Sequence, residues 1–400
     1  MPEAVIVATG RTPIGRAFKG SLKDCRPDDL AALAIKEVVA KVPALDPALI
    51  EDIVLGCGQP AGEAGFNIAR VAALLAGIDA PGITVNRYCS SSLNSIRIAA
   101  HAIKAGEGDV FVAAGVETSS RFQFGMADSG SPNTRFADAQ ARTAARSTGE
   151  GGGWTPPTGL PDIYIAMGQT AENVAEHEGV SREEMDEFAA RSQQRAVASQ
   201  ERGFFDREII PVTTPDGTVV SVDDGPRPGT TVEKLATLQP AFKPDGKVTA
   251  GNACPLNDGA AAVVVMSDTK ANELGITPLA RIVSSGVSAL SPEIMGLGPI
   301  EASRQALTRA GLTIDQIDQV EINEAFAAQV LPSAKHLGID IDAQLNPNGG
   351  AIALGHPFGM TGARIMATLI NGLEDSGGRY GLETMCVGGG QGLAMIIERL

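Results

Sequence analysis

An internal repeat is the feature that most limits the fold of this 400-residue chain, because it requires two similar halves. The segment Leu45–Gly58 resembles the segment Leu312–Glu324. A helical pattern follows each segment, and each unit ends in Gly-Ile-Asp, at residues 77–79 and 338–340. Strand and helix patterns alternate in both halves. This alternation predicts an α/β fold of layered units with mostly parallel central sheets.

The first and last strands of each half are also repeated, and they locate an insertion. Ala4–Val7 resembles Ala280–Val283, and Gly259–Met266 resembles Gly392–Ile397. The first half is interrupted after the strand pattern at 110–115 and closes only near residue 259. A long insertion of this kind is usually functional. The predicted domains are an N-terminal α/β half (1–118 and 251–272), an inserted loop domain (119–250) and a C-terminal α/β half (273–400).

Cys89 lies where a buried strand pattern, residues 82–86, gives way to a helix. The helix pattern ends at Gly106 and is carried by Leu93, Ile96, Ala100 and Ile103. Unpaired N–H groups at the start of a helix favour an anion, so we expect the pKa of the Cys89 thiol to lie below its ordinary value of about 8.5. The alternative is a buried structural cysteine.

Three further polar residues lie at strand ends or turns. His356 stands between a glycine and a proline, which places its ring on a turn. Asn323 lies where another strand pattern gives way to a helix, and Cys386 ends an apolar strand. The glycines that follow, Gly388–Gly390, allow backbone N–H groups to approach a ligand, as an oxyanion hole requires. Taken singly, each of these residues also fits a purely structural role.

Together these residues suit carbon–carbon bond chemistry on a thioester. Cys89 would be the nucleophile, His356 would deprotonate it, and Cys386 would move a second proton. Ligands of open α/β sheets bind beyond the carboxyl ends of the strands. Because Cys89 and His356 hold comparable positions in the two halves, a pseudo-twofold axis would bring them face to face.

With these motifs, the chain resembles the thiolase family over essentially its whole length. Four motifs occur in the family's order, a much more specific signal than a lone Gly-His-Pro. They are Asn86–Ser92, Asn323–Phe326, Gly355–Pro357 and Cys386–Gly390. Further matching stretches are Met167–Ala175, Gly251–Ala260 and Met295–Pro299. The resemblance implies duplicated α/β domains in α-β-α-β-α layers, with an inserted loop domain that binds coenzyme A.

The resemblance also implies an acyltransferase, an acetyl-CoA C-acyltransferase or C-acetyltransferase that works through a Cys89 acyl-enzyme. His356 would take the proton of Cys89, and Cys386 would act as acid and base on the α-carbon of acetyl-CoA. Asn323, through a water, and His356 would stabilise the enolate oxygen. The N–H groups of Cys89 and Gly388 would form a second oxyanion hole.

The same resemblance assigns residues to substrate binding. Arg227 should lie near the adenine or phosphates of coenzyme A, with Lys234 as a weaker candidate. Cys254 stands where many relatives have a serine near the pantetheine, and Ala166 stands where some short-chain relatives have a histidine. The second departure leaves room for acyl groups longer than acetoacetyl. The other residues assigned to this surface are Met167, Met295 and Phe326.

Composition limits the partners and the setting. The net charge of −15 and pI near 4.8 argue against nucleic acid, and require a locally basic surface for anionic coenzyme A. Five cysteines without a Cys-x-x-Cys pair argue against a disulfide scaffold or a zinc site. We expect no metal and no cofactor, with coenzyme A acting as substrate, and we expect no membrane span. The protein should be a cytoplasmic homo-oligomer, either a dimer or a tetramer. It should act in fatty acid metabolism such as β-oxidation.

Three alternatives remain open at this point. A condensing enzyme of decarboxylative type is disfavoured because its chemistry needs no base at the α-carbon, where this chain has Cys386. A non-catalytic lipid- or CoA-binding relative would be expected to lose Cys89 or His356. A nicotinamide-dependent dehydrogenase is poorly supported, because no Gly-x-Gly-x-x-Gly follows the first strand. The acyl chain length, the direction of the reaction and the choice between dimer and tetramer stay open.

Overall fold

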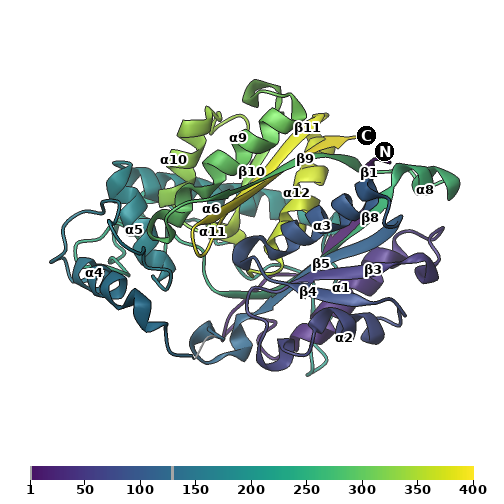
Figure 1. Ribbon diagram of the computed structural model, residues 1–400, viewed down its shortest axis with the longest axis horizontal. Helices are drawn as coiled ribbons and strands as arrows, with labels where there is room; N and C mark the ends of the chain where they lie inside the picture. Colours follow the sequence, from purple (N-terminus) through teal and green to yellow (C-terminus); the bar gives the residue numbers. More distant parts are fainter. Residues whose placement is uncertain (1, 128–129) are drawn as a thin grey trace.

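The computed structural model describes residues 2–127 and 130–400. Its main sheet has the strand order β10-β11-β12-β9-β1-β8-β5-β3-β4, with β2 paired to β8 (Figure 1). The strands are β1 (Ala4–Arg11), β2 (Gly15–Arg16), β3 (Asp52–Gly56), β4 (Gly82–Val85), β5 (Val110–Thr118), β8 (Asn257–Ser267), β9 (Ala280–Ala289), β10 (Gln319–Ile322), β11 (Tyr380–Val387) and β12 (Gln391–Arg399).

The order and directions of the strands reproduce the repeat expected from the sequence. In the first half the order is β3-β5-β8-β1, and in the second it is β10-β11-β12-β9. In both halves the first two strands are parallel and the later neighbours are antiparallel. The expectation of mostly parallel sheets was therefore wrong. Since only Gly388–Gly390 separate β11 from β12, the two strands form a tight hairpin, and a hairpin is antiparallel.

The helices form layers on and between the two halves of the sheet. They are α1 (Pro27–Ala40), α2 (Ile68–Leu75), α3 (Ser91–Ala105), α4 (Ala137–Ser147), α5 (Met167–His177), α6 (Arg182–Glu201), α7 (Val232–Ala236), α8 (Asp268–Glu273), α9 (Gly298–Ala310), α10 (Ala327–Leu337), α11 (Ala351–Leu354) and α12 (Thr361–Ser376). Figure 1 shows α3 and α12 between the strands of the first half and those of the second.

Three apolar clusters correspond to these layers. One joins α1 and α2 to the outer face of the first half, and another joins α9 and α10 to the outer face of the second. The central cluster contains the apolar faces of α3 and α12 together with inward-facing residues of both sheet halves. The arrangement is the α-β-α-β-α layering that was expected, and it places the starts of α3 and α12 beside each other.

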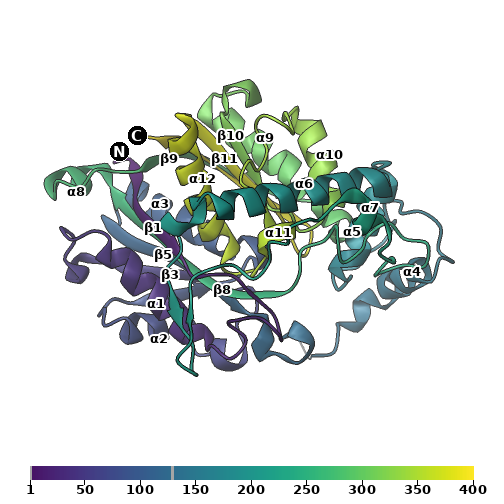
Figure 2. The same ribbon diagram turned by 180° about the vertical axis from the view of Figure 1, so that it is seen from behind.

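Residues 119–250 hold α4 to α7 and the small strands β6 (Val212–Thr213) and β7 (Val219–Val220). Figure 2 shows α6 running along the second half of the molecule. A buried ion-pair network ties this segment to β1: Arg11 Nε donates to Glu208 Oε1 at 2.8 Å, and its Nη1 donates to Asp223 Oδ1 at 2.7 Å. Because all three side chains are buried, loss of one partner would be strongly destabilising.

Among the described residues, none of the helices combines the length and the apolar character that crossing a bilayer requires.

Candidate active site

Cys89 lies on a strained turn between β4 and α3. It is the middle residue of a 3-10 turn, Tyr88–Ser90, and Tyr88 has a positive φ of 41°. Two side chains hold this turn: Asn86 Oδ1 accepts from the Tyr88 N–H at 2.8 Å, and the Ser91 hydroxyl donates to the Tyr88 carbonyl at 2.7 Å. The turn therefore fixes Cys89 at the start of α3, as the sequence predicted.

The expected lowering of the Cys89 pKa is wrong for this structure. Burial raises the pKa of the thiol to about 11, and the negative charge of Glu117 acts in the same direction. The backbone N–H groups of Gly388 and of Cys89 itself oppose the shift, because they favour the thiolate. Desolvation thus outweighs the helix start. The same contacts place the Gly388 N–H at the sulfur, where an oxyanion hole needs a donor.

His356 is buried and held on both sides of its ring. Its Nδ1 lies 2.6 Å from Thr361 Oγ1, whose hydroxyl is 2.8 Å from the Pro357 carbonyl and donates to it. The Thr361 oxygen therefore accepts from Nδ1–H, which leaves Nε2 without a proton. Burial, with the positive charge of Arg364, lowers the pKa of His356 to about 3. The ring is thus a neutral base whose unprotonated nitrogen is Nε2.

The backbone of His356 is fixed by a close contact between the two halves. Gly355 has φ of +110°, and a Cβ there would lie 2.6 Å from the side chain of Asn257. The Asn257 Oδ1 accepts the His356 N–H at 2.9 Å. Only glycine fits at position 355, since a side chain would be strained and would collide with Asn257.

Asn323 contacts the catalytic histidine. Its Nδ2 lies 3.3 Å from His356 Nε2 and donates to it, given the tautomer above. Gln329 holds the backbone of Asn323 by donating to its carbonyl at 2.7 Å. The buried Oδ1 of Asn323 has no hydrogen-bond partner among the described residues. The side-chain amide of Asn323 and the histidine nitrogen Nε2 are therefore in contact.

Cys386 completes the group from the end of β11. The thiol is fully buried, and its pKa is raised well above the ordinary value by burial and then by the charges of the Cys89 and Cys254 sulfurs. The three sulfurs are therefore close enough to influence one another. After Cys386, Gly389 and Gly390 both have φ of +81°, and a Cβ on Gly390 would lie 2.2 Å from the Leu290 carbonyl. The turn that carries the Gly388 N–H requires glycine.

The sequence did not single out Glu117, which links the two catalytic loops. This buried carboxylate ends β5 and accepts N–H groups from Gly58 at 2.8 Å and from Gly359 at 2.9 Å. Gly359 follows His356 by three residues, so Glu117 joins the first half to the histidine loop. Burial raises the pKa of Glu117 to about 7. The strand-end rule that found Asn323 and Cys386 would have found it too, since Glu117 ends an apolar strand.

A pocket is lined by residues of α7 and α11 and by Ala253, the neighbour of Cys254 in sequence. Arg227 lines it, and so does Arg16, which sequence reasoning missed. Burial lowers the pKa of Arg227, and the charge of Arg16 adds to this, so the two cations are close enough to repel each other. Lys234 does not line the pocket; its ammonium donates to the Gly229 carbonyl at 2.6 Å. The prediction for Lys234 is therefore not supported by its position.

The other predicted substrate residues gather around Cys386. Met295 and Phe326 are buried in the same apolar cluster as Cys386, with Met167 and Cys254 packed against it. The Met167 sulfur lies near Gly388, 3.7 Å from where a Cβ would stand. The structure thus places these four residues in or against one apolar cluster with Cys386, whereas Arg227 lines the separate pocket described above.

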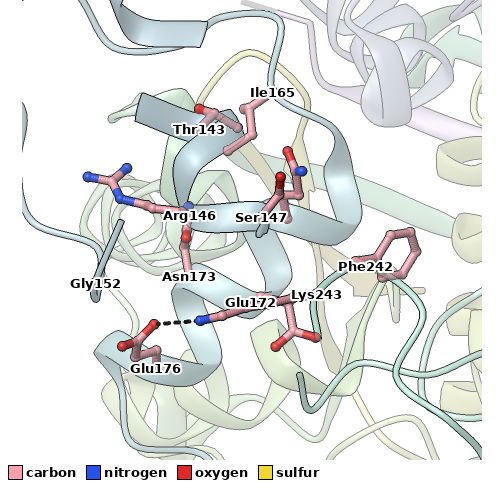
Figure 3. A pocket seen from close by; sticks show the side chains of 11 residues that line it. Thr143, Arg146, Ser147, Gly152, Ile165, Glu172, Asn173, Glu176, Phe242 and Lys243 are labelled. Carbon is pink, nitrogen blue, oxygen red and sulfur yellow. Dashed lines mark ion pairs between the residues drawn. The ribbon is translucent and has the colours of Figure 1, made fainter. Parts of the chain in front are cut away.

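A second pocket lies beside α5 and is separate from the catalytic group (Figure 3). Lys243 and Glu176 form an ion pair of 3.6 Å there. Phe242 lines this pocket and packs edge-on against Phe326, with ring centroids 6.3 Å apart. The Phe242 ring also covers Gly168, where a Cβ would lie 2.3 Å from it. Phe242 therefore stands between this pocket and the catalytic residues.

Comparisons with known proteins agree with this geometry. Residues 4–269 match the family model of the thiolase N-terminal domain, and residues 276–399 match that of the thiolase C-terminal domain. The chain is 45% identical to a beta-ketoadipyl-CoA thiolase of Acinetobacter baylyi, over 100% of both proteins. It is 46% identical to a 3-ketoacyl-CoA thiolase of Pseudoalteromonas translucida, again over 100% of both. Its structure resembles the acetyl-CoA acetyltransferase of Bacillus anthracis, with a TM-score of 0.86, 39% identity and coverage of 100% and 99%.

Proposed function

Since the chain belongs to the thiolase family, we propose that it cleaves 3-ketoacyl-CoA thioesters with free coenzyme A through an acyl-enzyme on Cys89. The observation that supports this proposal is the proximity of the Cys89 and Cys386 sulfurs, with the Gly388 N–H at Cys89, together with a buried neutral His356 that contacts Asn323.

In the first half-reaction, His356 Nε2 takes the proton of Cys89, and the sulfur attacks the 3-keto carbon. The N–H groups of Cys89 and Gly388 stabilise the oxyanion of the tetrahedral intermediate. The bond between C2 and C3 then breaks, and its electron pair forms the enolate of acetyl-CoA. His356, now protonated, and Asn323 stabilise the enolate oxygen, while the Cys386 thiol protonates C2.

In the second half-reaction, the thiol of coenzyme A attacks the acyl group on Cys89. The Cys386 thiolate formed in the first step accepts the proton of the incoming thiol. The same oxyanion hole serves again, and the departing Cys89 sulfur recovers the proton held by His356. The products are acetyl-CoA and an acyl-CoA shortened by two carbons. Because the side chains and coenzyme A supply every step, we expect the activity to persist in EDTA.

For the acyl group, we propose a chain longer than acetoacetyl that ends in a carboxylate. Two observations support this: Ala166 stands before Met167, where a histidine would fill space, and several relatives are named beta-ketoadipyl-CoA thiolases. Acetoacetyl-CoA and the straight-chain substrates of β-oxidation are the alternatives. For coenzyme A itself, we propose that Arg227 and Arg16 bind its phosphates, since two arginines that repel each other suit an anionic ligand.

The test compares 3-ketoadipyl-CoA with 3-ketohexanoyl-CoA, which has the same chain length but no carboxylate, and with acetoacetyl-CoA. Loss of the enolate absorbance after addition of coenzyme A reports cleavage. We expect cleavage that disappears in Cys89→Ala, with the highest kcat/KM for 3-ketoadipyl-CoA. Equal rates for the two six-carbon substrates would reject the carboxylate preference and leave the thiolase activity standing. No cleavage of any substrate by the folded protein would reject the activity itself.

We further propose that the chain forms a homodimer through β4. This strand lies at the end of the sheet order, so one of its edges is unpaired among the described residues. Exposed apolar side chains surround it: Phe66 is 87% exposed, Leu74 58% and Ile83 49%. An apolar edge strand favours pairing with a second copy.

Mass measurement by light scattering tests this interface. We expect a dimer, or a tetramer built from dimers, and a shift to monomer in Ile83→Lys. Val219→Lys, at an exposed apolar position on β7, is the control and should not change the mass. An unchanged mass in Ile83→Lys would place the interface elsewhere.

A further inference from the structure

A basic pocket lies at the opposite end of α3 from Cys89. We call this the α3–β9 pocket, and its volume is about 350 Å³. Four basic side chains line it: Arg97, His101 and Lys104 from α3, and Arg309 from α9. Its remaining lining residues are Ala100, Ile282, Val283, Ser284, Ser285 and Met395. The pocket shares no lining residue with the catalytic group.

The basic side chains of this pocket are held by neutral acceptors. Arg97 Nε donates to Ser285 Oγ at 3.2 Å, and Lys104 Nζ donates to the Ile282 carbonyl at 3.1 Å. Arg309 Nη1 donates to the Ser285 carbonyl at 2.5 Å. These contacts orient the side chains but leave their charges unbalanced. In residues 2–127 and 130–400, no Asp or Glu forms an ion pair with Arg97, Lys104 or Arg309.

The lack of acidic partners is unusual for this chain, which has 47 acidic and 32 basic residues. The cations in the pocket instead repel one another. Burial lowers the pKa of Arg97, and the charges of Arg87 and Arg309 add to the effect. Burial likewise lowers the pKa of His101, together with Arg97, Lys104 and Arg309. A concave site with repelling, oriented donors is stabilised by an anion.

We propose that the α3–β9 pocket binds a small phosphate or phosphate monoester. Guanidinium groups offer paired N–H donors that match phosphate oxygens, and two of them reach this pocket from different helices. Its volume lies at the lower end for small-molecule sites, which fits a phosphate with a small organic group. Ile282, Val283 and Met395 supply an apolar wall for that group.

The bound anion would join the two halves of the molecule. Arg97, His101 and Lys104 belong to the first half, whereas Arg309 and the β9 residues belong to the second. A phosphate bridging Arg97 and Arg309 removes their repulsion and holds α3 against β9. Since binding to the folded state alone raises stability, the anion raises the Tm. The proposal is independent of the activity proposed above.

The experiment measures Tm and binding heat of the whole protein with inorganic phosphate, against sodium chloride of equal ionic strength. We expect phosphate to raise the Tm by about 2 °C or more at saturating concentration. Arg97→Gln and Arg309→Gln should abolish the rise and the binding heat. Arg304→Gln, on the same helix as Arg309 but outside the pocket, is the matched control and should keep both.

Histidine NMR gives a second measurement on the native protein, which has only four histidines. A bound dianion raises the pKa of His101, so its signal should titrate at higher pH in phosphate than in chloride. The proposal is overturned if Arg97→Gln and Arg309→Gln keep the full rise in Tm, or if His101 does not respond. The proposal is also overturned if phosphate changes neither the Tm nor the binding heat and Arg97→Gln changes the oligomeric mass. That result would mean that acidic side chains of a second copy occupy the pocket.

Discussion

At the scale of single residues, burial sets the protonation of the catalytic pair. The pKa of Cys89 is raised to about 11, whereas that of His356 is lowered to about 3. Both shifts favour neutral groups, because each charged form would be desolvated. The resting pair at neutral pH is therefore thiol and imidazole.

Alkylation of Cys89 by iodoacetamide tests this assignment. We expect its rate to rise steadily from pH 7 to 10 without a plateau, since a thiol with a raised pKa gains thiolate throughout this range. Peptide mass spectrometry follows the modification of Cys89 separately from the other four cysteines. A plateau near pH 7 would instead show a preformed thiolate–imidazolium pair.

Thr361 holds the catalytic histidine in the tautomer that carries its proton on Nδ1. In Thr361→Val, Nδ1–H has no acceptor, so the ring can move its proton to Nε2 and no longer accept from Cys89. We expect kcat to fall about tenfold, as roughly 1–2 kcal/mol for one buried hydrogen bond implies, with KM nearly unchanged. Thr361→Ser keeps the hydroxyl and should restore most of the rate. Equal rates in the valine and serine variants would contradict this role.

At the scale of elements, the approach of α3 and α12 sets the geometry of the site. Cys89 precedes α3 and His356 precedes α12, and both helices lie in the central layer. Gly362, in the first turn of α12, faces the backbone of Leu93, where a Cβ would lie 2.3 Å from the Leu93 nitrogen. The Ser92 hydroxyl also accepts the Ala363 N–H at 2.9 Å. The distance between nucleophile and base thus depends on this crossing.

Gly362→Ala should force the two helices apart. We expect a loss of about 2–3 kcal/mol in the free energy of unfolding, measured by urea denaturation, because the added methyl group meets rigid backbone. The rate should also fall, since Cys89 and His356 separate. Gly159→Ala, at a loop position where a Cβ meets nothing within 4 Å, is the control and should change neither quantity. A stable and active Gly362→Ala enzyme would disprove this constraint.

At the scale of the whole molecule, buried carboxyl groups make stability depend on pH. Burial raises the pKa of Glu117 to about 7 and that of Glu321 to about 8. The folded state therefore keeps protons that the unfolded state has already released above its pKa near 4.5. The protonated forms of these two carboxyl groups therefore add to the free energy of unfolding at low pH, and this contribution is lost as pH rises through 7 to 8.

The Tm should therefore fall between pH 6.5 and 8 at constant ionic strength. His356 and His101, whose lowered pKa values make stability rise with pH, oppose this fall only at the lower edge of the window, because the unfolded histidine has released most of its protons above pH 7. Glu321 alone accounts for about 1–2 kcal/mol. Glu321→Gln keeps the acceptor for Gln319 and should flatten the pH dependence, as differential scanning calorimetry can show. A Tm that rises over this window would contradict the assignment.

Much of this arrangement was predictable from local sequence patterns. The repeat gave the two halves, and the rule that polar residues at strand ends mark a site identified Cys89, Asn323 and Cys386. Helix α12 starts only at Thr361, because the turn after Pro357 is needed to hold His356. The features that were missed depend on tertiary contacts.

The pKa of Cys89 was mispredicted because sequence indicates a helix start but not the depth of burial around it. Neither Arg16 nor Thr361 belongs to a sequence pattern that marks a site. Arg16 acts together with a residue far along the chain, and Thr361 acts on a residue across a turn. The place of Lys234 outside the pocket was likewise not visible from the sequence, because it depends on the contact of its ammonium with the Gly229 carbonyl. The antiparallel strands were missed because periodicity carries no information on strand direction.

The place of β8 in the sheet determines when the first half can be completed during synthesis. β8 lies between β1 and β5, so these two strands have no common ladder until it arrives. The ribosome adds residues 119–256 between the end of β5 and the start of β8, which takes roughly 7–30 s at typical elongation rates. Throughout that interval the nascent first half exposes two unpaired strand edges. The turn that carries the nucleophile is therefore made early, but the sheet that supports it closes only after the insertion has left the ribosome.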